Sequence, residues 1–192
     1  TANELPATQA ALPSGQKVQV STDVYDLAFD TQGAQLVHAK LLRFKATDGS
    51  NQPMVLLDDT PGNIYLVQTG IVGAPQGQSY PTHLTPFRLV SSDTTMTGDT
   101  LDVVFEAEAG DLKVVKTYTL HKGRYDIGVK HELFNQGGQP VTPALYLQLT
   151  RDGNDPPDTS FFYNTFTGPA VYSSEDKYQK ISFSDINKNK AN

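Results

Sequence analysis

Cysteine and tryptophan are absent from this chain of 192 residues, and methionine occurs only twice. Without cysteine, the chain has no disulfide framework, no thiol nucleophile and no zinc site with cysteine ligands. The redox compartment stays open, because a cysteine-free chain suits both the cytosol and the periplasm. The absence therefore excludes classes of chemistry and leaves the location undecided.

Long apolar runs are also missing. No apolar stretch approaches the roughly 18 residues that a membrane-spanning helix needs, and no signal-peptide core precedes Thr1. We therefore expect these residues by themselves to be soluble in water. Whether they were cut from a longer protein is a separate question, which these features leave open.

An excess of positive charge is lacking too. The 15 lysine and arginine residues are outnumbered by 21 aspartate and glutamate residues, which gives a net charge of −6. Nucleic-acid-binding domains carry a basic face that releases counterions from phosphates, so we expect no nucleic-acid partner. With 38% hydrophobic residues, the chain has the composition of a globular domain and enough length to bury a core.

Alternation of apolar and polar residues dominates the sequence, and this period of two is typical of half-buried strands. Four such segments, separated by short turns that contain glycine, occupy 101–107, 112–120, 125–133 and 141–149. They predict an antiparallel meander with one buried face. The fold class is therefore all-β, and an antiparallel two-sheet sandwich is the architecture that closes this many strands.

Earlier segments carry the same period, with one irregularity. Between Val24 and Tyr25 the apolar residues change parity, which indicates a β-bulge or a corner. The only helix start signal is in Ser173–Lys180, with Ser174 as its candidate N-cap. Residues 1–16 hold few large apolar side chains and are expected to form a flexible linker before a domain at 17–187.

Catalytic and metal-binding motifs are not found in the sequence. There is no G-x-S-x-G elbow, no glycine-rich phosphate loop and no H-E-x-x-H motif. The histidines His38, His83, His121 and His131 show no metal-ligand spacing. A calcium loop and a solvated acidic turn compete for Asp152, Asn154, Asp155 and Asp158, and Pro156-Pro157 favours the turn. We predict no catalytic residues, no metal and no cofactor.

A cluster of aromatic residues late in the chain allows two interpretations, and its members are Phe161, Phe162, Tyr163, Phe166 and Tyr172. They close the core beneath a loop, which we favour, or they line a groove that binds a sugar or an apolar peptide. The candidate cleft or partner-binding residues are Phe161, Tyr163, Phe166, Tyr172, Tyr178 and Phe183.

Two adjacent stretches carry a family resemblance. These are 166–172 (FTGPAVY) and 175–186 (EDKYQKISFSDI), and they agree in order with 20–33 (VSTDVYDLAFDTQG) and 116–125 (KTYTLHKGRY). Together they resemble the YidC-type membrane protein insertases of Gram-negative bacteria, over about residues 18 to 187. In this comparison, 188–192 looks like a truncated link toward the membrane-embedded bundle.

The resemblance implies a large periplasmic domain of an inner-membrane protein, with a β-supersandwich fold similar to galactose mutarotases. Such insertases help hydrophobic segments enter the bilayer, alone or beside the Sec translocon. The implied partners are the Sec translocon, its SecDF auxiliary complex and nascent membrane proteins. The last would bind through a membrane bundle that these residues do not include. On this interpretation the domain is a non-catalytic interaction or spacer module.

Two other classes remain open at this point. The first is a mutarotase-like sugar-binding protein or aldose epimerase, which would use His131 or His83 with an acid such as Glu132 or Asp126. Fold kinship alone confers no such activity. The second is a structural periplasmic domain without a ligand.

Overall fold

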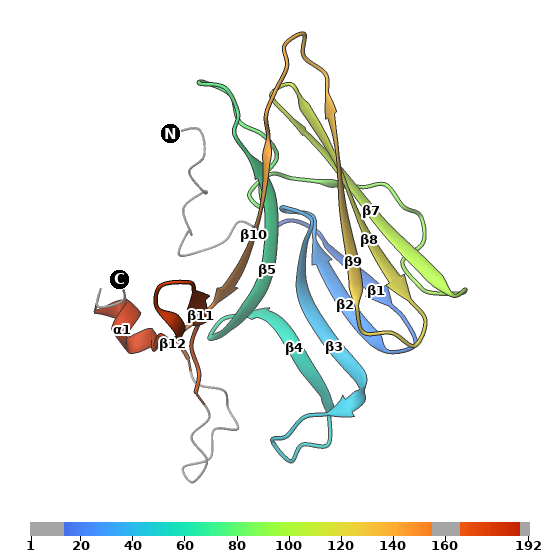
Figure 1. The fold of residues 1–192 in the computed structure, drawn as a ribbon. Coiled ribbons are helices and arrows are strands. Elements are labelled where there is room, and N and C mark those ends of the chain that lie inside the picture. The colour runs from blue at the N-terminus through green and yellow to red at the C-terminus, as the bar shows by residue number, and fades with distance from the viewer. Residues whose placement is uncertain (1–13, 155–165, 189–192) are drawn as a thin grey trace.

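The computed structural model describes residues 14–154 and 166–188, in which there are twelve strands and one short helix. The strands form a six-stranded sheet, a four-stranded sheet and a separate hairpin (Figure 1). The larger sheet contains β1 (Lys17–Ser21), β2 (Tyr25–Asp30), β3 (Gln35–Lys45), β4 (Pro53–Thr60), β5 (Asn63–Val72) and β10 (Ala144–Arg151). The smaller sheet contains β6 (Arg88–Leu89), β7 (Thr100–Ala109), β8 (Leu112–His121) and β9 (Ile127–Asn135).

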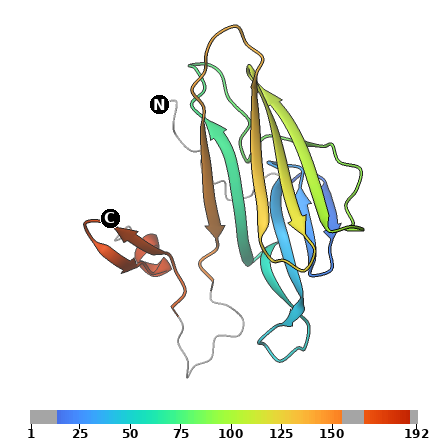
Figure 2. The ribbon, with the colours of Figure 1, turned by 45° about the vertical axis from the view of Figure 1, so that its right-hand side comes forward.

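The two sheets pack face to face, and every strand pair within them is antiparallel. Figure 2 shows them as two layers. The prediction of an all-β fold built from two antiparallel sheets is confirmed, and the likeness to galactose mutarotases stays a prediction. No helix in the described ranges is long and apolar enough to cross a bilayer.

The core lies between the inner faces of the two sheets. Its centre is an aromatic group in which the Phe29 ring is 4.6 Å from that of Tyr118 and 5.8 Å from that of Phe105. Strand β8 shows why the sequence folds this way: its alternate residues Leu112, Val114, Lys116, Tyr118 and Leu120 are all buried. Alternation thus places one residue in two into the core.

The predicted meander is confirmed for β7, β8 and β9 but is wrong for the fourth segment. Strand β10 leaves this sheet and pairs with β5 over eight residues, from Ala144 opposite Val72 to Arg151 opposite Tyr65. The connection at 136–143 carries the chain from one sheet to the other at one end of the sandwich (Figure 1). Alternation specifies which residues share a face, but not which strand edge they join.

The change of parity at Val24 is a corner between two strands. The Thr22 side chain accepts hydrogen bonds from the backbone amides of Val24 and Tyr25, at 3.2 and 2.9 Å, and turns the chain from β1 into β2. A bulge does occur, but later, between Ala28 and Phe29. Of the two alternatives, the corner is therefore the one found at this position.

The helix start predicted in Ser173–Lys180 is wrong. This segment forms a hairpin of β11 (Ala170–Ser173) and β12 (Lys177–Lys180), with Tyr172 opposite Tyr178. The β-favouring residues on both sides of the turn outweigh the capping signal of Ser174. The one described helix, α1 (Phe183–Asn187), follows instead, and Ser182 caps it by accepting a bond from the Asp185 amide. Figure 2 shows the hairpin and α1 to one side of both sheets.

The ends of the described chain bear on the predicted boundaries. Strand β1 begins at Lys17, and just before it the amides of Gly15 and Gln16 donate to the side chains of Asp30 and Thr31. Residues 1–13 of the predicted linker and residues 189–192 of the predicted link lie outside the described residues.

Gly33 provides a test of the close packing at the β2–β3 turn. It has a φ of 72°, and a Cβ atom there would lie 2.3 Å from the backbone oxygen of His83. Gly62 has a φ of 85° but open space around it. We expect Gly62→Ala to lower the free energy of unfolding in urea by about 1 kcal/mol, from backbone strain alone. Gly33→Ala should cost about 1–3 kcal/mol more, because the loop that carries His83 must move. Equal losses would contradict this packing.

Candidate functional site

Three of the four described aromatic residues of the predicted site are exposed. Tyr172 and Tyr178 face each other across the hairpin, with 70% and 62% of their surface accessible. Phe166 is 40% accessible, and the Lys180 ammonium lies 5.2 Å from the centre of its ring. The interpretation that the aromatic cluster closes the core is therefore wrong for its two described members, Phe166 and Tyr172. Phe161 and Tyr163 lie outside the described residues.

Phe183 differs from the other three, because it is partly buried at the start of α1. The Arg151 guanidinium, at the end of β10, lies 5.9 Å from the Phe183 ring and 5.8 Å from the Tyr65 ring. Arg151 thus contacts aromatic residues on both α1 and β5. The structure brings Tyr172 and Tyr178 together, while Phe183 belongs to this second contact.

A buried cation occupies the core between the sheets. The Lys116 ammonium donates to the backbone oxygen of Gly33 at 2.7 Å and lies 5.1 Å from the centre of the Phe87 ring. Its neighbour on the same face, Tyr118, donates to the backbone oxygen of Ala34 at 2.6 Å. Among the residues that the structure describes, no carboxylate is paired with Lys116. Burial without such a partner lowers the pKa of Lys116 to about 7.

His131 joins the two sheets beside Lys116. Its Nε2 atom lies 3.0 Å from the hydroxyl of Thr69 on β5. Burial, followed by the charge of Lys116, lowers the pKa of His131 to about 4. Glu132 points to the opposite face of β9, where it pairs with Lys130 at 2.8 Å. The pair of His131 and Glu132 considered for sugar chemistry is therefore not assembled.

His83 is fully buried and also lacks an acidic partner. Its Nδ1 atom lies 2.6 Å from the hydroxyl of Tyr146 on β10, and its Nε2 atom has no hydrogen-bond partner within the described ranges. Burial and then the charge of Lys116 lower the pKa of His83. Asp126, its other proposed acid, is paired with Arg124 in the exposed turn before β9. His83 is thus part of the packing that holds β10.

A row of three glutamines, of which Gln35 and Gln68 are buried and Gln148 partly buried, extends this packing across the larger sheet. Gln148 donates to Gln68 at 2.6 Å, Gln68 donates to Gln35 at 2.7 Å, and Gln35 donates to the backbone oxygen of His83 at 2.9 Å. The row connects β10, β5 and β3 on the face opposite the sandwich core. The side-chain amides hydrogen-bond to one another, so they stabilise the fold and do not form an open binding site.

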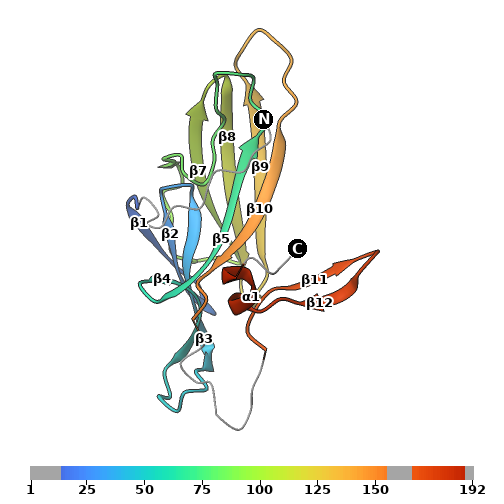
Figure 3. The ribbon, with the colours of Figure 1, turned by 90° about the vertical axis from the view of Figure 1, so that its left-hand side faces the viewer.

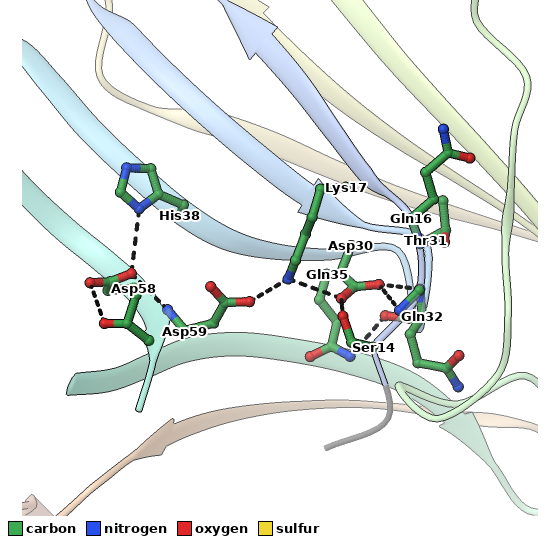
Figure 4. Close-up of polar contacts among 12 residues, drawn as sticks. Ser14, Gln16, Lys17, Asp30, Thr31, Gln32, Gln35, His38, Asp58 and Asp59 are labelled. Carbon is green, nitrogen blue, oxygen red and sulfur yellow. Dashed lines mark hydrogen bonds and ion pairs between the residues drawn. The ribbon is translucent and has the colours of Figure 1, made fainter. Parts of the chain in front are cut away.

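Sequence reasoning missed a charged cluster on the same face, which Figure 4 shows. Lys17 lies between Asp30, at 3.0 Å, and Asp59. Nearby, the His38 Nδ1 atom is 3.6 Å from the Asp58 carboxylate. Burial opposes the charge of Asp58, but hydrogen bonds from neighbouring side chains outweigh it and lower its pKa. These side chains meet because of the register of β1, β2, β3 and β4. The sequence does not give that register, so it gave no signal of the cluster.

Metal binding gains no support from this geometry. In residues 14–154 and 166–188, no three histidine or acidic side chains converge to hold an ion. Asp152, from the acidic turn, accepts a bond from the backbone amide of Ile64 at 2.6 Å and so fastens the end of β10 to β5. Asp155 and Asp158, the other acids of the calcium alternative, lie outside the described residues.

Lys116 predicts a pH dependence of stability. Its pKa is about 7 when folded, against 10.5 for an ordinary lysine, so between these values the unfolded chain holds the extra proton. The free energy of unfolding should therefore rise with pH in this window, by up to about 1.4 kcal/mol per unit. Lys116→Met should remove the rise and Lys122→Met, in an exposed turn, should keep it. Denaturant titrations from pH 6 to 10 measure this, and equal slopes in both variants would contradict it.

The comparisons with known proteins agree with one another. Residues 17–192 match the sequence profile of the YidC periplasmic domain. The chain is also similar to proteins called membrane protein insertase YidC. The Bordetella parapertussis protein is 61% identical over 91% of this chain, and the Bordetella avium protein is 54% identical over 97%. The Burkholderia cenocepacia protein is 44% identical over 97%.

The chain spans about a third of the length of these relatives, with 31%, 33% and 34% of their sequences covered. The match to this profile includes every residue of both sheets and all of the hairpin. The chain therefore belongs to the YidC membrane protein insertase family and corresponds to its periplasmic domain.

Proposed function

We propose that this domain lies on the periplasmic side of the bacterial inner membrane and is a non-catalytic interaction or spacer module of an insertase. The whole insertase would help inner-membrane proteins to insert and fold, alone or with the Sec translocon. The observation that carries this proposal is the match of residues 17–192 to the YidC periplasmic domain. Its relatives are named for insertion into membranes and not for a chemical reaction.

The use of the polar side chains supports a role without chemistry. A general acid or base needs its proton within reach of a bound substrate. Here Lys116, His131 and His83 are each turned into the packing between strands, where they bond to Gly33, Thr69 and Tyr146. Groups that hold a fold together in this way are not presented to a substrate.

The hairpin offers the partner-binding surface of this proposal. Tyr172 and Tyr178 form an exposed aromatic pair on a two-stranded unit that pairs with no other described strand. Aromatic residues are enriched where proteins meet, because they bury much surface at little entropic cost. We assign this surface to contact with periplasmic parts of the Sec translocon or of its SecDF complex.

The double variant Tyr172→Ser and Tyr178→Ser in the full-length insertase tests this surface. We expect normal protein levels and copurification with the translocon reduced by at least about tenfold, because truncation of an aromatic hot spot costs about 2 kcal/mol or more. Phe134→Ser is the matched control, since Phe134 is a half-exposed aromatic on β9. Unchanged copurification of the double variant would remove the hairpin from the proposal.

The sugar alternative predicts a different result. A mutarotase-like enzyme would speed the interconversion of hexose anomers, and polarimetry would detect this directly. We expect no acceleration above buffer, because neither His131 nor His83 meets Glu132 or Asp126. Acceleration by this chain that is lost in His131→Ala would favour the enzyme and contradict a non-catalytic domain.

A further inference from the structure

The outer part of the β3–β4 hairpin extends beyond the sandwich. Residues 42–56 form this projecting segment, the β3–β4 arm. It begins after Leu41, which packs against the core, and ends before the buried Leu57. Figure 3 shows the arm at the bottom of the view, past the ends of both sheets. Most of its residues are exposed, and those that are partly buried are Ala46, Pro53 and Met54.

Large apolar side chains of the arm are exposed to water. They are 38% to 50% accessible, and they are Leu42, Phe44, Val55 and Leu56. The turn that joins the two strands, at 46–52, contains no large apolar residue, so the apolar side chains belong to the strands themselves. Grouped apolar residues on the surface of a domain mark a place where it meets another surface.

The apolar residues lie on both faces of the arm. The Phe44 ring is 5.3 Å from that of Tyr125, which packs against the core, so Phe44 is on the core side. Val55 is opposite Lys40 in the strand register. The neighbours of Lys40 on β3 point into the core, so Lys40 and Val55 point to the other side. The occupant of this surface must therefore reach both faces of a narrow hairpin.

Positive charge is concentrated on the arm and its base, although the chain as a whole is acidic. Residues 40–56 contain three cations and one acid, Asp48, and so carry a charge of +2 in a chain of net charge −6. The cations are Lys40, Arg43 and Lys45. Arg43 pairs with Asp23 at 2.6 Å, yet 58% of its side chain stays accessible. This local charge favours an anionic partner.

We propose that the β3–β4 arm binds the surface of a phospholipid bilayer that contains anionic headgroups. The exposed apolar side chains of the arm enter the interface, and the three cations lie among the phosphates. Segments that anchor proteins at membrane surfaces combine exposed apolar and basic residues in this way. The inference rests on the location at the inner membrane that is proposed above.

Two observations favour a bilayer over a protein partner. A protein that covered one face of the arm would leave apolar residues of the other face in water, whereas a fluid interface surrounds both. The chain also spans about a third of relatives that are named for insertion into membranes. A domain that the rest of its polypeptide holds at a bilayer meets the surface at high effective concentration, so a contact of modest affinity is sufficient.

A fluorophore in the turn of the arm tests the contact in the full-length insertase, reconstituted in nanodiscs that contain phosphatidylglycerol. Ser50→Cys carries the label once any cysteines elsewhere are replaced, and it leaves the apolar and basic residues intact. The control is Gln76→Cys, in the exposed loop after β5 at the opposite end of the sandwich. We expect lipids with a nitroxide headgroup to quench the Ser50→Cys label at least about twofold more than the control. Equal quenching would overturn the proposal.

Removal of positive charge from the arm is a second test, read as the ratio of quenched to unquenched label. Lys40→Gln with Lys45→Gln should lower this ratio by at least about tenfold, because each cation near an anionic surface strengthens binding roughly fivefold. The matched control, Lys113→Gln with Lys130→Gln, removes two cations from the outer face of the smaller sheet and should leave the ratio unchanged. Equal ratios in the two double variants would overturn the proposal.

A photo-reactive amino acid in place of Leu56 identifies the occupant. We expect an adduct whose added mass is that of a phospholipid. A cross-link to a second copy, to another protein or to another part of the insertase would overturn the proposal. The nanodisc supplies the bilayer, so such a failure would leave the proposed location and the translocon contact of the hairpin intact. Absence of the insertase from the inner-membrane fraction of cells would instead contradict the location.

Discussion

Contact between the inner faces of the two sheets is the interaction on which the rest of the structure depends. The rings of Phe29, Phe105 and Tyr118 form its centre, and each comes from a strand that alternates buried and exposed residues. Burial of such side chains supplies most of the free energy that folds a domain of this size. The glutamine row and the charged cluster lie on the outer face of the larger sheet that this contact positions.

The polar groups at the margin of this core give the sandwich its specific alignment. Lys116 on β8 bonds to the β2–β3 turn, His131 on β9 bonds to Thr69 on β5, and His83 bonds to Tyr146 on β10. Burying these groups costs free energy, which their hydrogen bonds offset only in one arrangement of the sheets.

Sequence reasoning reached the local features of this fold and missed the non-local ones. The alternation in β8 predicts Leu112, Val114, Tyr118 and Leu120 as buried, and they are. The same alternation in β10 makes Leu145 a core residue, but its partner strand and its exposure depend on pairing across the fold. The helix N-cap predicted at Ser174 is a local signal that did not determine the structure. The segment forms a hairpin instead, in which Tyr172 pairs with Tyr178.

The candidate site shows the same division. The exposed tyrosines were identifiable by type, since aromatic residues near turns are frequent contact residues, but their exposure was not. The pairing of His38 with Asp58 and the burial of Lys116 depend on strands far apart in the chain. Family membership came from short matching segments, which carry evolutionary information that no physical pattern contains.

Hydrogen exchange of this domain tests the central claim, that the packing of the two sheets against each other holds the rest of the structure. The relevant groups are the backbone amides of β7 and β8, whose alternate side chains are buried between the sheets. The account predicts that these amides exchange only when the whole domain unfolds, and so far more slowly than those of the exposed turn at Lys122. Exchange in β7 and β8 as fast as that of the Lys122 turn would contradict the claim.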